Sequence, residues 1–134
     1  MKLTQMTKAC ALVAATLFGA SAQAQISGDV IKIGFITDMS GLYADIDGPA
    51  GAEAIRMAIA DLGGAINGKK IELLVADHQN KPDVAASKAR EWFDQQGMDM
   101  LIGGTNSGTG LAMAKVTLEK KKDRKSTRLN SSHG

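Results

Sequence analysis

The sequence predicts an α/β fold, a partial doubly wound parallel sheet built in the order β-α-β-α-β-α. Three short apolar segments rich in β-branched residues indicate strands, and each is followed by a segment with helical periodicity. Loops rich in Gly, Asp and Asn separate them. Alternating strands and helices imply right-handed crossovers and a mostly parallel sheet, and we expect the strand order 2-1-3. Doubly wound sheets usually have more strands, so this region is expected to be the first part of a larger lobe.

The first unit begins with residues 30–36, "VIKIGFI", which are expected to form a strand buried on both faces. A Gly- and Asp-rich loop, residues 37–48, follows it. A helix is expected from Pro49, which suits a first helical turn. Its predicted apolar stripe is Ile55, Ile59 and Leu62, and Gly63-Gly64 marks its end.

The second unit has a strand at residues 70–76, "KIELLVA", and a loop at residues 77–83. The helix after this loop is expected to end at Gly97 and to pack through one stripe: Ala85, Ala89, Trp92 and Phe93. The third unit has a strand at residues 99–104, "DMLIGG", and the loop "TNSGTG". A third helix then carries a predicted stripe of Leu111, Ala114 and Leu118.

Residues 1–24 read as a cleaved secretory signal, which predicts a periplasmic protein. Lys2 and Lys8 form a positive start, residues 9–20 are apolar, and "AQA" precedes the expected cleavage after Ala24. The apolar run is shorter than the roughly 20 residues that cross a bilayer. Cleavage would also remove Cys10, the only cysteine, so we expect neither a disulfide nor a cysteine-bound zinc ion in the mature chain.

Composition and motifs argue against an enzyme and against a nucleic-acid-binding protein. Acids slightly outnumber bases in residues 25–122, which gives no electrostatic case for nucleic acid or an anionic membrane. "GTNSG" does not match the serine-nucleophile motif G-x-S-x-G, and no phosphate-binding glycine motif is present. His78 is the only histidine of this region, so no histidine metal cluster is expected. We therefore predict no cofactor and no metal.

The loop after the third strand is the main candidate ligand site. Ligands of open parallel sheets lie beyond the carboxyl ends of the strands. Thr105, Asn106, Ser107 and Gly108 lie there, at the start of a helix whose free N–H groups and dipole favour an anion such as a carboxylate. The alternative is an ordinary helix cap, with Asn106 or Ser107 as the N-cap residue.

Two other loops are expected to border this site. Tyr43 lies in the loop after the first strand, where it either covers a ligand or packs on a neighbouring residue. Asp77 and His78 follow the second strand and are possible flanks of the cleft. For His78 a solvated loop histidine is the favoured interpretation.

Residues 30–122 resemble the start of a type I periplasmic binding protein. The resemblance rests on "IKIGFITDMSGLYADIDG", "ADHQNKPD" and the "NSG" after the third strand, and it is strongest to the branched-chain amino acid (Leu/Ile/Val) substrate-binding family of ABC transporters. It implies a monomer with two α/β lobes and a hinge, which closes on a small ligand and delivers it to an inner-membrane permease. It also implies that Ser107 binds the ligand carboxylate and that Tyr43 covers the ligand.

The identity of the ligand stays open at this point. "HQNKPD" also resembles family members that bind carboxylates other than branched-chain amino acids. The family's acidic partner for a ligand ammonium belongs to the second lobe, which has no counterpart in this chain. Two other functions stay open as well: a ligand-binding lobe of a sensory system, and an exported α/β enzyme.

Residues 123–134, "DRKSTRLNSSHG", are expected to be a non-native tail. Written back into codons, residues 123–133 match a widely used sequencing adapter. The resemblance would require a fourth strand at this point, so we expect the natural sequence to stop at about Lys122. The alternative is a basic arm for nucleic acid, which lacks accompanying aromatic residues.

Overall fold

The structure is a computed structural model that describes residues 28–103 and 105–131, with side chains as far as Lys121. The predicted signal at residues 1–24, including Cys10, lies outside the described residues, as does Gly104 of the third predicted strand. The elements, in chain order, are β1 (Val30–Thr37), α1 (Ala44–Asp47), α2 (Pro49–Asp61), β2 (Ala65–Ile66), β3 (Lys69–Asp77), α3 (Pro82–Gln95), β4 (Met100–Gly103) and α4 (Ser107–Ser131).

The strands form one sheet in the order β2-β3-β1-β4. β1 pairs in parallel with β3, from Val30 opposite Lys70 to Thr37 opposite Asp77, and in parallel with β4 on its other side. The predicted α/β class and the order 2-1-3 of the parallel strands are thus confirmed. The antiparallel strand β2 was not predicted, because a strand of two residues is too short to show a periodicity.

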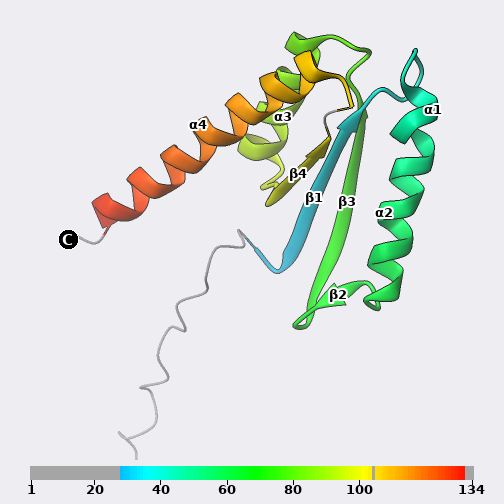
Figure 1. Ribbon diagram of the computed structural model, residues 1–134. Helices are drawn as coiled ribbons and strands as arrows, with labels where there is room; N and C mark the ends of the chain where they lie inside the picture. Colours follow the sequence, from blue (N-terminus) through cyan, green and yellow to red (C-terminus); the bar gives the residue numbers. More distant parts are fainter. Residues whose placement is uncertain (1–27, 104, 132–134) are drawn as a thin grey trace, which may run out of the picture.

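Helices cover both faces of the sheet, with α2 on one face and α3 and α4 on the other (Figure 1). Successive residues of β1 point to opposite faces, as a strand requires. Phe35 faces α2, where it lies against Gly51, whereas Gly34 lies under Trp92 and Met98. A side chain at Gly34 would collide with both of these residues, so α3 can approach the sheet only because this position is a glycine.

The core lies between the sheet and the layer of α3 and α4. Its fully or nearly buried members are Ile36, Ala85, Ala89, Trp92, Met98, Met113 and Val116. The predicted stripe of the second helix is confirmed, because Ala85, Ala89 and Trp92 are buried and Phe93 packs against them. Ion pairs from Arg90 to Glu119 (3.6 Å) and from Lys120 to Asp94 (2.7 Å) also join α3 to α4. Such partly exposed pairs stabilise a fold only slightly.

The predicted stripe of the third helix was wrong. Leu111 is 73% exposed, Leu118 is 60% exposed and Ala114 is exposed as well. α4 instead packs through Met113 and Val116, which lie on another face of the same helix. The physical reason is that α4 has two apolar faces, and α3 covers only one of them.

The ends of two helices also differ from the sequence prediction. α2 begins at Pro49 as expected, and Ile55 and Ile59 of its predicted stripe are half-buried, but Leu62 follows the last residue of the helix and is 59% exposed. α4 continues to Ser131, so this helix includes residues 123–131 of the predicted non-native tail. Within the described part of the chain, no helix is long and apolar enough to cross a membrane.

Candidate functional site

Three loops meet at one edge of the sheet. The carboxyl ends of β1, β3 and β4 lie together because the three strands are parallel, and the loops that follow them surround this edge (Figure 1). The loops include residues 38–43, 78–81 and 105–106. The structure therefore brings the predicted site residues of all three loops to the same end of the molecule, as the rule for ligand sites in open α/β sheets requires.

Asn106 caps helix α4. Its side-chain oxygen accepts hydrogen bonds from the N–H groups of Gly108 (2.9 Å) and Thr109 (3.4 Å), and its carbonyl accepts from the Thr109 hydroxyl (2.8 Å). Of the two predicted cap residues, Asn106 fills this role. Ser107 is the first residue of the helix, and it is exposed.

The cap narrows the set of groups that could bind an anion. The N–H group of Gly108, a predicted ligand contact, is already engaged by Asn106. Ser107 remains exposed in the first turn of the helix, where the dipole favours negative charge. The hydroxyl oxygen of Thr105 is buried and has no hydrogen-bond partner among the described residues. Ser107 and Thr105 are therefore the predicted contacts that this loop leaves available.

The loop after β1 is organised around Asp38, which is fully buried. Its carboxylate accepts hydrogen bonds from the N–H groups of Ser40 (3.3 Å), Gly41 (2.7 Å) and Tyr43 (2.9 Å). Burial raises the pKa of Asp38, but the hydrogen bonds outweigh burial and hold the pKa below its ordinary value. Tyr43 is half-buried and lies immediately before α1.

Asp77, one of the two predicted flanks of the site, is the last residue of β3. Asp77, partly buried, accepts a hydrogen bond at 2.8 Å from the N–H group of Gln79. Burial raises the pKa of Asp77, but the hydrogen bonds that the carboxylate accepts outweigh this effect and lower the pKa.

The prediction of a solvated His78 was wrong, because this side chain is fully buried. Its Nδ1 accepts a hydrogen bond from the N–H group of Asn80 (3.0 Å), so the neutral ring carries its proton on Nε2. Nε2 has no hydrogen-bond partner among the described residues. Burial lowers the pKa of His78, and the negative charges of Asp38, Asp77 and Asp47 only partly oppose this effect.

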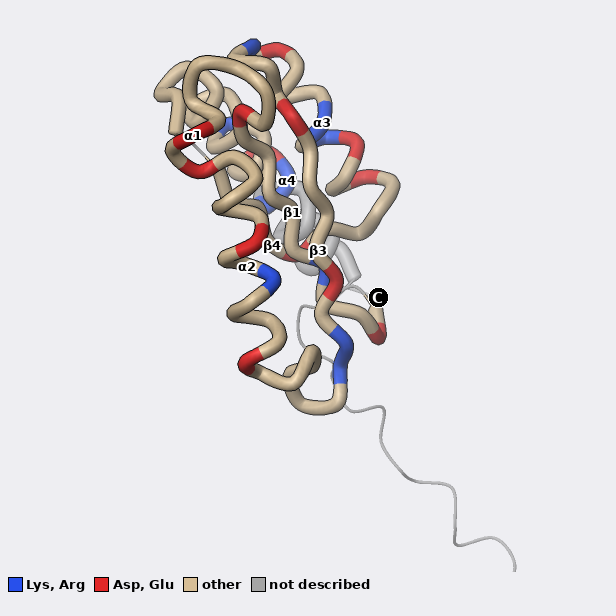
Figure 2. Tube along the Cα trace, turned by 90° about the vertical axis from the view of Figure 1, so that its right-hand side faces the viewer, with Lys and Arg blue, Asp and Glu red and all other residues tan. Residues whose placement is uncertain are grey.

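Charges near the carboxyl edge of the sheet are not uniformly suited to an anion. Acidic residues occur on and beside α1, among them Asp45 and Asp47 (Figure 2). An anionic group is therefore favoured only locally, at the start of α4. Residues 28–103 and 105–131 contain no group of three or more His, Cys, Asp or Glu residues that could hold a metal ion.

Comparison with known proteins gives a consistent family. The sequence pattern of the family described as "Periplasmic binding protein" matches residues 30–122. A periplasmic binding protein from Burkholderia mallei is 69% identical, with a TM-score of 0.68 over 69% of this chain and 25% of that protein. No match was found among curated proteins.

Two further solved structures are similar. A branched-chain amino acid ABC transporter periplasmic ligand-binding protein from Burkholderia xenovorans LB400 is 45% identical, with a TM-score of 0.65 over 68% of this chain and 24% of that protein. A solute-binding protein of an ABC transporter from Rhodopseudomonas palustris BisB5, in complex with 3,4-dihydroxybenzoic acid, is 29% identical. Its TM-score is 0.62 over 66% of this chain and 24% of that protein. The chain thus spans about a quarter of the length of these proteins.

Proposed function

The chain belongs to the periplasmic binding protein family, and on this basis we propose that it is the first part of a two-lobe protein that binds a small carboxylate for an ABC importer. The observation that carries this proposal is the exposed Ser107 in the first turn of α4. This residue lies at the edge of the sheet where β1 and β3 also end. The hydroxyl can donate a hydrogen bond to a carboxylate, and the helix dipole favours the negative charge.

The names of the similar proteins point to two classes of ligand. One relative is named for branched-chain amino acids, and another was solved with 3,4-dihydroxybenzoic acid. Both classes carry a carboxylate, and that shared group is the one we assign to Ser107. An aromatic acid lacks the ammonium group of an amino acid, so the second lobe would decide between the two classes.

The test requires both lobes, and a chimera supplies them. In this two-lobe chimera, residues 30–122 of the present chain replace the matching quarter of the Burkholderia mallei protein, which is 69% identical over the aligned region. Calorimetry with L-leucine, L-isoleucine and 3,4-dihydroxybenzoate identifies which probe the chimera binds. Binding of none of the three would contradict the proposed ligand class.

Ser107→Ala in the two-lobe chimera is expected to weaken binding of that probe by roughly tenfold to a hundredfold. The reason is that a hydrogen bond to a charged group contributes about 1.5–3 kcal/mol. Ser87→Ala is the matched control, because Ser87 is also an exposed serine but lies within α3 and not in the first turn of α4. An unchanged dissociation constant for Ser107→Ala, measured by calorimetry, would reduce Ser107 to an ordinary first-turn residue.

We also propose how the whole protein is made and used. Residues 1–24 would export it to the periplasm and be removed, and the mature protein would act as a monomer that delivers its ligand to an inner-membrane permease.

Residues 123–134 would not belong to the natural protein. Sequencing the genomic locus tests this last point, since a native reading frame that continues with residues 123–134 would contradict it.

Burial of His78 predicts a specific pH dependence of stability. The folded pKa lies below the ordinary value of 6.5, so the unfolded chain takes up a proton at a higher pH than the folded protein does. The free energy of unfolding of the two-lobe chimera should therefore fall as the pH drops below about 6.5. His78→Gln should make this fall shallower in urea denaturation series. Equal slopes in both proteins would show that His78 does not contribute.

A further inference from the structure

Two carboxylates connect the loops after β1 and β3 in both directions. Asp38, which follows β1, accepts a hydrogen bond from the side-chain amide of Asn80 in the other loop (2.8 Å). Asp77, at the end of β3, accepts from the N–H group of Met39 (3.1 Å) and from the hydroxyl of Ser40 (2.6 Å). Each loop thus provides the acceptor that fixes the other, and we call these bonds the loop clasp.

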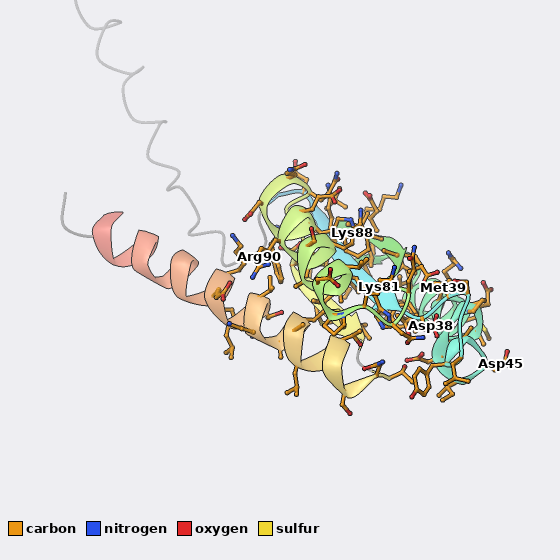
Figure 3. All side chains as sticks on the ribbon, turned by 90° about the horizontal axis from the view of Figure 1, so that it is seen from above. Asp38, Met39, Asp45, Lys81, Lys88 and Arg90 are labelled. Atoms are coloured by element: carbon orange, nitrogen blue, oxygen red, sulfur yellow. The ribbon has the colours of Figure 1, made fainter. Side chains whose placement is uncertain are left out.

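The clasp lies where the two loops meet. Figure 3 shows Asp38, Met39 and Lys81 close together at this point, whereas Arg90 lies farther along α3. Apolar packing supports the loop after β1 only in part, since Met39 and Tyr43 are half-buried and Leu42 is 82% exposed. The hydrogen bonds from the backbone N–H groups to Asp38 therefore hold the backbone between Ser40 and Tyr43.

The loop after β3 has an unusual backbone conformation, which neighbouring side chains stabilise. Gln79 and Asn80 both have left-handed conformations, with φ of 53° and 58°, which residues other than glycine adopt rarely. Their N–H groups are held by Asp77 Oδ1 (2.8 Å) and His78 Nδ1 (3.0 Å). This support fixes the Asn80 amide in position to donate to Asp38.

We propose that Asp38 and Asn80 are positioning residues for ligand binding, which hold Tyr43 at the carboxyl edge of the sheet. Asp38 is fully buried and accepts the Tyr43 N–H, so it acts on a ligand through Tyr43. The inference rests on the proposed function, since it assumes that Tyr43 covers a ligand. It adds two residues that do not contact the ligand and on which affinity nevertheless depends.

A double-mutant cycle in the two-lobe chimera separates positioning from general support of the fold. Asp38→Asn replaces one acceptor oxygen by an NH₂ group, which cannot accept the bonds made by that oxygen. We expect it to weaken binding of the probe by about tenfold when Tyr43 is present, and by less than about twofold in the Tyr43→Ala background. Equal losses in both backgrounds, or no loss in either, would overturn the proposal.

A milder variant guards against misfolding of Asp38→Asn. Asn80→Gly removes the donor to Asp38 and retains a residue that tolerates a positive φ. Gln79→Gly is its matched control, because Gln79 has nearly the same φ and an exposed side chain. We expect Asn80→Gly to weaken binding several-fold more than Gln79→Gly, and faster amide hydrogen exchange at Gly41 and Tyr43 in Asn80→Gly only.

The outcomes also distinguish this inference from the proposed function. If the unmutated chimera binds none of the carboxylate probes, the proposed function fails, and the exchange rates at Gly41 and Tyr43 still test the clasp. If the chimera binds a probe, but Asn80→Gly and Gln79→Gly have the same affinity and the same exchange rates, the positioning role is wrong and the proposed function stands.

Discussion

Trp92→Ala in the two-lobe chimera is expected to lower the free energy of unfolding by about 3–5 kcal/mol, the usual cost of truncating a large buried aromatic side chain. Trp92 is only 7% exposed and packs over Gly34 of the central strand β1, within the core cluster of α3 and α4. The cavity left by the indole could not be filled from below, because Gly34 has no side chain. Urea denaturation measures the change.

Met57→Ala is the comparison variant for Trp92→Ala. Met57 is also a large apolar residue on a helix, but it is 62% exposed on α2. Its truncation should change the free energy of unfolding by no more than about 0.5 kcal/mol, as is usual for surface substitutions. Similar decreases in the free energy of unfolding for the two variants would mean that α3 does not pack on β1 through Trp92.

The 134-residue chain on its own should bind the carboxylate probe at least about a hundredfold more weakly than the two-lobe chimera. The chain spans about a quarter of its relatives, so the groups that a second lobe would place against the ligand are missing. A ligand group that is desolvated on one side and unpaired on the other loses about 1–3 kcal/mol for each such group. Calorimetry on the chain and on the chimera measures the difference.

The isolated chain should also self-associate. Among the described strands, β4 pairs only with β1, and its other edge is open beside Met100, which is 49% exposed. Leu111 and Leu118 of α4 add exposed apolar surface. Open strand edges and apolar patches recruit other chains. Sedimentation velocity should therefore show concentration-dependent association, and a monodisperse monomer at every concentration would contradict this prediction.

The site could be predicted from the sequence in part. The position of residues 105–108 after a parallel strand predicted that they lie at the carboxyl edge of the sheet, where the structure has them, because the rule depends only on chain order. Asp38 was missed. Ser40 and Gly41 follow it closely, and an Asp at such a position often accepts hydrogen bonds from the following backbone, so this local signal could have found it. Its bond to Asn80 joins residues 42 positions apart, and no local pattern reveals it.

The sequence by itself determined the alternation of strands and helices, the order of the three parallel strands and the buried stripe of α3. The alternation and the stripe follow from periodicity, which is a local property, and the connectivity of the chain limits the possible strand orders. Only the tertiary structure decided which of the two apolar faces of α4 is buried, that His78 is enclosed and that Asp38 and Asp77 join two loops. Each of these depends on what another segment places against the residue, and the residue's own neighbours in sequence do not carry that information.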